Sequence, residues 1–183
     1  GGVSINKVCG SGLKAVMLAA NAIKAGDGEV YIAGGAESMS GAPFLIREHR
    51  TGFKYGKSEL IDALQHDGLW CTLCDWSMGS AAEFVGRELG VTRAEIDQFA
   101  YTSHMRAQAA TVEGRFADEI VPVVIPGRKG DTVVERDESI RPDTSLEALA
   151  KLKPAFEENG IVTAGNAPGM NDGAAALVVA SRA

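Results

Sequence analysis

A glycine-rich turn between a short apolar run and a helical pattern constrains the fold of this chain most strongly. The apolar run is Val3 to Val8, and the turn is Gly10 to Gly12. Gly26 is placed to end the helix, and Glu29 to Ala33 form a second strand-like run. A strand, a helix and a second strand make a βαβ unit, which predicts a parallel sheet. Because apolar residues occupy all faces of the helix, we expect it to be buried all round; its main apolar positions are Leu13, Val16, Met17, Ala20 and Ile23.

Cys9 stands where this turn enters the helix. Small residues follow it, so another molecule can approach the thiol closely, which is the arrangement of a nucleophile on a strand-to-helix turn. The positive end of the helix dipole and the unpaired N–H groups of the first turn favour a thiolate there. A buried structural cysteine is the alternative, because that is the more common environment of a free cysteine. The spacing alone leaves both interpretations open.

Composition argues against several classes of protein. The chain has 183 residues, of which 45% are hydrophobic, enough for one ordinary domain or a domain with an appendage. Its formal net charge of −6 argues against a nucleic-acid-binding protein, which is usually basic. No apolar run reaches the about 20 residues that span a bilayer, so we expect no membrane partner. Three cysteines without a visible secretory signal suggest reduced thiols and a cytoplasmic location.

The middle of the chain predicts an excursion from the sheet. Residues 41–76 lack sustained periodicity and are expected to be mainly loop. Thr92 and Glu95 form a capping-box pattern at the start of a helix that has Phe99 on its apolar side and runs to about Glu113. The other expected elements are helices at Met78 to Leu89 and Leu146 to Leu152, and strands at Val121 to Ile125, Thr132 to Val134 and Gly173 to Ala180.

Several uninterrupted motifs resemble the thiolases, and they follow one another in order along the chain. The longest are Asn6 to Val16, Ala33 to Ser40 and Thr163 to Ala176; Asp118 to Pro122 and Lys151 to Phe156 match between them. The resemblance implies an α/β protein with a thiolase-like layered α/β/α fold. Residues 1–40 and 161–183 would belong to a partial, nucleophile-bearing N-terminal domain, and residues 41–160 to an inserted α/β loop domain for coenzyme A binding and oligomer contacts. We therefore expect an internal fragment that lacks the first strands and the C-terminal half.

The same resemblance implies an acyl-CoA acyltransferase that works through an acyl-cysteine. The reaction would be the Claisen condensation of two acetyl-CoA to acetoacetyl-CoA, or the reverse thiolysis of a 3-ketoacyl-CoA. Coenzyme A would be substrate or product, so no separate cofactor and no metal are expected, and the full-length protein would form a homo-oligomer, either a dimer or a tetramer. By resemblance, Cys9 is the acylated residue, Leu69, Ser77 and Met78 lie at the pantetheine and thioester end, Arg141 lies at the adenine end, and Gly169 and Met170 lie beside the pantetheine chain.

The chain departs from the thiolase pattern in two ways. Ser77 stands where many thiolases have His, and Pro168 stands where they have Ser, which bears on the pantetheine contacts and not on the nucleophile. The Gly-His-Pro, Cys-x-Gly-Gly-Gly and Asn-Glu-Ala-Phe motifs, which carry the other catalytic groups of the family, do not occur in this sequence. We therefore expect this chain alone not to complete catalytic turnover.

Two other functions stay open at this point. A ketoacyl-synthase-type condensing enzyme shares the fold and the cysteine, although the Asn6 to Gly12 and Asn171 to Ala176 motifs favour a thiolase. A non-catalytic coenzyme A-binding or assembly module is the second.

Cys71 and Cys74 form a Cys-x-x-Cys pair that invites a zinc or redox interpretation. Structural zinc sites normally need four ligands, and no second cysteine pair is present. We expect the two thiols to form an apolar wall with Trp70 and Leu73, while a disulfide between them could form under oxidation.

Overall fold

The computed structural model describes residues 1–182, apart from the side chain of Glu48. The chain forms two compact units. The first unit is Gly1–Ser77 together with the segment that begins at Gly169, and the second is Met78–Pro168. These boundaries differ from those expected for the domains, at residues 40 and 160, and the domain division itself stays a prediction.

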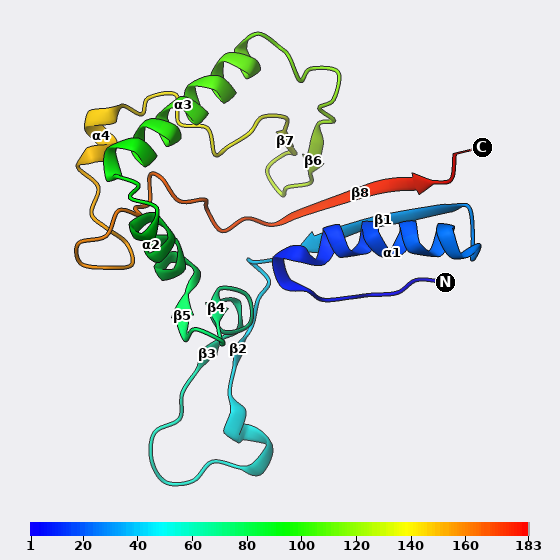
Figure 1. Cartoon of the computed structure of the whole chain (residues 1–183), viewed down its shortest axis with the longest axis horizontal. Helices are drawn as coiled ribbons and strands as arrows, with labels where there is room; N and C mark the ends of the chain where they lie inside the picture. The colour runs from blue at the N-terminus through cyan, green and yellow to red at the C-terminus, as the bar shows by residue number, and fades with distance from the viewer. Residues whose placement is uncertain (183) are drawn as a thin grey trace. The chain divides into compact units, whose positions relative to one another are not determined.

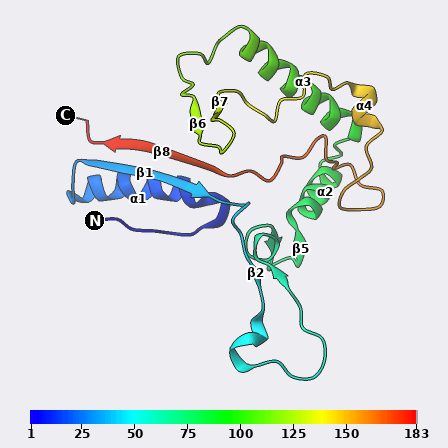
Figure 2. The ribbon, with the colours of Figure 1, turned by 180° about the vertical axis from the view of Figure 1, so that it is seen from behind.

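The centre of the first unit is a helix packed beside two paired strands. Helix α1 (Ser11–Ala25) ends at Gly26, whose φ of 81° is a left-handed conformation that glycine adopts readily. Strands β1 (Val30–Glu37) and β8 (Gly173–Ala180) pair antiparallel, with Val30 opposite Ala180. Figures 1 and 2 show β1 and β8 side by side with α1 along them.

The predicted parallel sheet is wrong. Val3 to Val8 do not form a strand: the chain has no regular structure until the 3₁₀ turn η1 (Val8–Gly10), and, among the described residues, the sheet beside α1 consists of β1 and β8 alone. An apolar run becomes a strand only where a neighbouring strand pairs with its backbone groups. Here β1 pairs with β8, and the side chain of Asn6 takes up the N–H of Val8 instead.

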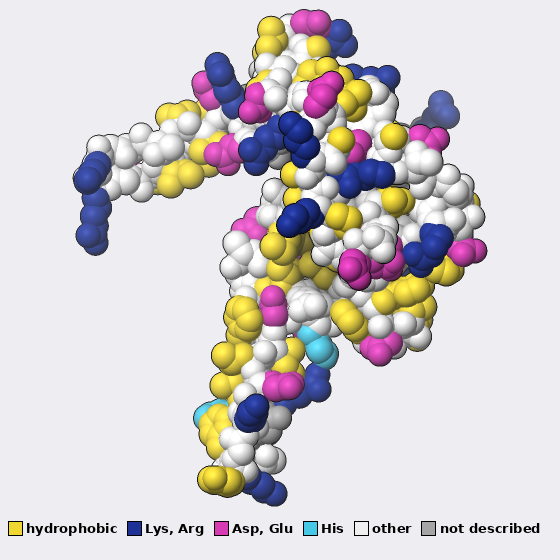
Figure 3. Space-filling model, turned by 90° about the vertical axis from the view of Figure 1, so that its left-hand side faces the viewer, with side chains coloured by type: hydrophobic (Ala, Val, Ile, Leu, Met, Phe, Trp, Pro, Cys, Tyr) yellow, Lys and Arg dark blue, Asp and Glu magenta, His cyan; other side chains and the backbone are white. Residues whose placement is uncertain are grey.

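The expectation that α1 is buried all round is also wrong. Leu13 is 70% exposed, and only Ala19 of this helix is buried. The reason is that the main contacts of α1 are with β1 and β8, which cover one side of the helix. Exposed hydrophobic side chains also lie among charged ones on the face of the molecule that Figure 3 shows.

Between β1 and the end of Ser77 the first unit has only short elements, as the lack of periodicity in residues 41–76 predicts. Two of the strand pairs are small antiparallel hairpins, β2 with β3 and β4 with β5. The elements are β2 (Phe44–Leu45), η2 (Arg47–Thr51), β3 (Ile61–Asp62), the π-helical turn η3 (Leu64–Gly68), β4 (Trp70–Cys71) and β5 (Trp76–Ser77).

The helices of the second unit begin where the sequence predicts. The Thr92 hydroxyl oxygen accepts the N–H of Glu95 at 3.3 Å, and the Glu95 carboxylate accepts the N–H of Thr92 at 2.8 Å, so the capping box is confirmed. Strands β6 and β7 form an antiparallel hairpin. The elements are α2 (Met78–Glu88), α3 (Arg93–Val112), β6 (Val123–Ile125), β7 (Thr132–Val134) and α4 (Leu146–Ala150).

Helix α3 of the second unit buries a carboxylate, although the helical pattern predicts that an aromatic residue lies on its apolar side. Phe99 is 79% exposed, whereas Asp97 is buried. The Asp97 carboxylate accepts from Arg93 Nε at 2.7 Å and from Asn166 Nδ2 at 2.8 Å. The Arg93 guanidinium also donates to the carbonyl of Leu149 at 2.5 Å. These polar contacts, rather than the apolar side of α3, decide which side of the helix faces the interior of the unit.

Candidate active site

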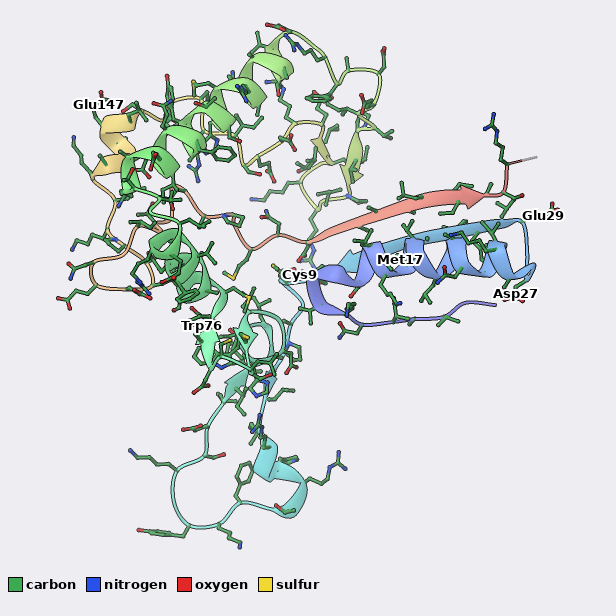
Figure 4. The ribbon with its side chains drawn as sticks, in the orientation of Figure 1. Cys9, Met17, Asp27, Glu29, Trp76 and Glu147 are labelled. Atoms are coloured by element: carbon green, nitrogen blue, oxygen red, sulfur yellow. The ribbon has the colours of Figure 1, made fainter. Side chains whose placement is uncertain are left out.

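Cys9 is an exposed thiol in η1, immediately before α1. Figure 4 shows it at the end of α1 where β1 ends, opposite the end that carries Asp27 and Glu29. The predicted turn before the helix is therefore present, and the alternative of a buried structural cysteine is excluded within the first unit.

The residue before Cys9 has an unusual backbone conformation. Val8 has a φ of 48°, which a β-branched residue rarely adopts. Its N–H donates to Asn6 Oδ1 at 2.8 Å, and its carbonyl accepts from the Ser11 hydroxyl at 2.7 Å. The same Ser11 oxygen accepts the N–H of Lys7 at 2.8 Å. These hydrogen bonds hold the strained turn that carries the exposed Cys9.

The backbone N–H of Cys9 differs from those of its neighbours. The N–H of Gly10 donates to the carbonyl of Lys7 at 3.0 Å, and that of Ser11 donates to the carbonyl of Val8. Among the residues that the structure describes, the N–H of Cys9 has no hydrogen-bond partner. A donor next to the thiol is thus available to an oxygen that develops negative charge on a molecule attacked by Cys9.

A cleft of about 1020 Å³ opens beside Cys9, and residues of the first unit alone line it. Small residues of α1, β1 and β8 leave the room for a ligand, namely Gly12, Gly34, Gly35 and Ala175. A side-chain carbon at Gly34 would collide with the carbonyl of Ala175, so this pairing of the strands requires a glycine there. Polar groups on the wall come from Asn6, Ser38, Asn171 and Asp172.

Asp172 joins the segment before β8 to the loop after β1. Its carboxylate accepts the N–H of Ser40 at 2.9 Å and also accepts the Ser40 hydroxyl. The Ser40 hydroxyl, followed by the N–H groups of Ser40 and Met39, holds the pKa of Asp172 below its ordinary value of 3.8. The carboxylate therefore stays ionised while it fixes one wall of the cleft.

The structure brings one of the predicted substrate-binding residues into the same cleft as Cys9. Leu69 is half-buried and lines the cleft. Ser77 is half-buried at the end of β5, outside the residues that line it. Gly169 and Met170 are exposed and directly precede Asn171 and Asp172 on the wall.

Met78 and Arg141 belong to the second unit. Met78 begins α2 and is exposed. Arg141 is exposed in the loop before α4, and its backbone N–H donates to His104 Nδ1 at 3.2 Å. Their coenzyme A contacts, like those of Leu69, Ser77, Gly169 and Met170, stay predictions.

The Cys71 to Cys74 segment does not form the predicted apolar wall. Leu73 is 94% exposed, and Cys74 is exposed as well. Both residues lie in the turn between β4 and β5, where the chain reverses and points its side chains outward. Within residues 1–182, no three side chains of histidine, cysteine, aspartate or glutamate gather as metal ligands do.

Sequence reasoning missed the residues that build the turn and the wall. Asn6, Ser11, Ser40 and Asp172 lie in or beside the quoted motifs, but no role is predicted for them. One signal in the sequence could have indicated the role of Asn6, which stands two residues before Val8. Asparagine side chains commonly accept the backbone N–H of a residue two positions further on.

Comparison with known proteins identifies the family. The model of the family "Thiolase, N-terminal domain" matches residues 2–183. The chain belongs to the thiolase family. This thiolase chain is similar to an acetyl-CoA acetyltransferase of Cupriavidus necator, with 53% identity over 99% of the chain and 46% of the relative. A probable acetyl-CoA acetyltransferase of Escherichia coli is 49% identical, again over 99% of the chain and 46% of the relative.

Solved structures of thiolases confirm the fold. The acetyl-CoA acetyltransferase of Syntrophomonas wolfei matches with a TM-score of 0.89 and 44% identity, over 95% of this chain and 44% of the other. Human mitochondrial 3-ketoacyl-CoA thiolase matches with a TM-score of 0.89 and 39% identity, over 97% of this chain and 45% of the other. The predicted α/β thiolase fold is thus confirmed. The chain spans about half the length of the curated relatives it matches.

None of the described helices is long and apolar enough to cross a membrane.

Proposed function

We propose that this thiolase chain carries the nucleophile for acyl transfer between coenzyme A thioesters. The observation that carries the proposal is the exposed Cys9 thiol, presented by the strained turn at Val8 on a cleft of about 1020 Å³. Membership of the thiolase family and the names of the relatives, acetyl-CoA acetyltransferase and 3-ketoacyl-CoA thiolase, support it.

The first step forms a thioester on Cys9. The thiolate sulfur attacks the carbonyl carbon of an acyl-CoA, and the bond from that carbon to the coenzyme A sulfur breaks. Coenzyme A leaves as a thiol after it takes up a proton. The carbonyl oxygen becomes negative in between, and the N–H of Cys9, which has no partner among the described residues, is placed to donate to it.

The second step belongs to the whole protein. The carbanion of a second acetyl-CoA attacks the acyl-cysteine in the synthetic direction, and coenzyme A attacks it at the end of thiolysis in the degradative direction. The groups that would deprotonate the thiol and the substrate lie in family motifs that this sequence does not contain. We accordingly assign acylation to this chain and complete turnover to the longer protein, which we propose to be a cytoplasmic homo-oligomer.

Peptide mass spectrometry after incubation with acetyl-CoA tests this function. We expect an acetyl group on Cys9, none on Cys71 or Cys74 of the same chain, and no acetylation of cysteine in Cys9→Ala. Acetylation spread evenly over the three cysteines would contradict the proposal. A separate assay for acetoacetyl-CoA should detect no product, and its formation by this chain alone would contradict the assignment of turnover to the longer protein.

A further inference from the structure

The hairpin of β4 and β5 holds two cysteines in one tight turn. Trp70 pairs with Ser77 and Cys71 with Trp76, which leaves Cys74 in the connection. The N–H of Asp75 donates to the carbonyl of Cys71 at 2.8 Å, and Asp75 has the left-handed φ of 55° that the reversal requires. Its carboxylate also accepts from the Trp70 indole at 3.2 Å, so the turn is fixed at both ends.

This turn brings the two thiols within reach of each other. Cys71 and Cys74 are the first and fourth residues of the five-residue turn that the bond from Asp75 to Cys71 closes. A disulfide joins residues whose Cα atoms lie about 4.4–6.8 Å apart, a spacing that two residues of one such turn can have. The pKa of each thiol is also shifted by the side chain of the other, which indicates that the two side chains face each other within the turn. A bond between the two sulfurs therefore joins residues of one turn, whose ends the hairpin already holds.

The two sulfurs have different chemical environments. The backbone N–H groups of Cys74 and then Leu73 donate to the Cys71 sulfur and lower the pKa of that thiol. The pKa of Cys74 is raised, chiefly because its proton is held in the hydrogen bond to Cys71. One sulfur is thus stabilised as a thiolate, which attacks, and the other keeps its proton beside it.

Small reagents can reach both thiols. Cys71 is half-buried and Cys74 is exposed, and the intervening Leu73 is 94% exposed. Within residues 1–182 no third ligating side chain joins the pair, so these thiols have the arrangement of a dithiol rather than of a metal site.

We propose that Cys71 and Cys74 form a thiol–disulfide exchange site for small disulfides of the glutathione class. The Cys71 thiolate attacks one sulfur of the small disulfide, whose S–S bond breaks; one small thiol leaves and takes up the proton that Cys71 has released. Cys74 then loses its proton and attacks the Cys71 sulfur, and the second small thiol leaves with that proton. The two cysteines lose two electrons to the small disulfide, which is reduced to two thiols.

Oxidised glutathione is the probe for this site. The whole chain is incubated at several ratios of oxidised to reduced glutathione, its free thiols are alkylated, and its peptides are mapped by mass spectrometry. We expect the peptide with Cys71 and Cys74 to lose two hydrogens and resist alkylation while Cys9 remains open to it. In Cys74→Ser, glutathione should accumulate on Cys71, and in Cys71→Ser the modification of Cys74 should be much slower.

The same chain in urea is the reference for the role of the hairpin. We expect the folded chain to form the Cys71–Cys74 disulfide at a lower fraction of oxidised glutathione than the unfolded chain. Equal oxidation of the folded and unfolded chain, or glutathione spread evenly over the three cysteines, would overturn the proposal. Acetylation of Cys9 is measured in a separate experiment. A failure of this proposal is therefore distinguishable from a failure of the proposed acyl transfer.

Discussion

Val8 carries the backbone conformation on which the presentation of Cys9 depends. A left-handed φ costs a β-branched residue about 1–3 kcal/mol, and the hydrogen bonds that Val8 makes with the side chains of Asn6 and Ser11 offset that cost. The sequence pattern predicts a turn at this point, but not that Val8 is the residue that bends, because valine resists this conformation more than its glycine neighbours do. Strain at the nucleophile thus depends on two side chains beside it.

Replacement of Ser11 tests this dependence. In Ser11→Ala the N–H of Lys7 loses its partner, and the carbonyl of Val8 keeps only the backbone N–H of Ser11, so we expect a loss of about 1 kcal/mol of unfolding free energy. Acetylation of Cys9 by acetyl-CoA should also slow several-fold. Ser181→Ala is the matched control, since only the backbone N–H of Ser181 is bonded. Unchanged acetylation in Ser11→Ala would show that the turn does not need this hydroxyl.

The wall residue Asp172 predicts a dependence of stability on pH. Its pKa is lower in the folded chain than its ordinary value of 3.8, so its stabilising effect is fully present above that value. The effect is lost as the pH falls through the lower, folded pKa. We expect Asp172→Asn to reduce the unfolding free energy at pH 7, and to reduce it much less under strongly acidic conditions.

Denaturant unfolding of a double-mutant cycle measures this effect. Ser40→Ala removes the principal partner of Asp172, so Ser40→Ala and Asp172→Asn together should cost less than the sum of the single losses. Strict additivity at pH 7 would rule out the pair as the source of the pH dependence.

At the scale of elements, helices are predicted better than strands. The ends of α1 and α3 have local signals, Gly26 and Thr92, because a helix closes its hydrogen bonds within one segment. The pairing of β1 with β8 joins segments far apart in the chain. No local pattern therefore predicts whether the two strands run parallel or antiparallel. The burial of Asp97 in place of Phe99 is equally hidden, since it depends on Arg93 and on the distant Asn166.

Glu83 gives a test at this scale, because it joins α2 to the end of the second unit. Its carboxylate is in a residue only 2% exposed and accepts the N–H groups of Ile161 and Val162, both at 2.8 Å. Glu83→Ala leaves one buried and one half-buried donor without an acceptor, so we expect a loss of about 3 kcal/mol in urea unfolding. Glu88→Ala, on the exposed end of the same helix, should change it by less than about 0.5 kcal/mol. Similar losses in the two variants would refute the role of the Glu83 contacts.

At the scale of the whole molecule, the exposed apolar side chains are the main feature. Ile32 on β1 is 80% exposed, and Val178, its partner on β8, is 73% exposed. Side chains of this kind on a soluble chain form a patch that favours association. The chain spans about half the length of its curated relatives. The behaviour of this patch is measured on this chain alone.

We expect this patch to bind a hydrophobic dye and to promote self-association as the concentration rises. Ile32→Lys should lower dye fluorescence and shift sedimentation toward the monomer, because a charge then stands in the patch. Leu73→Lys, at a leucine that is 94% exposed in the turn between β4 and β5, is the matched control and should have less effect. If both variants lower association equally, the patch on β1 and β8 is not its cause.

The bond between Ser40 and Asp172, which spans 132 positions, also sets when the site becomes complete. A ribosome releases Cys9, α1 and β1 early, but the wall of the cleft and the partner of β1 emerge only after the whole second unit has been made. The entropy of closing so long a loop grows only slowly with its length, so the delay arises from the order of synthesis rather than from the cost of closure. The nucleophile of this chain therefore exists before the pocket that gives it a substrate.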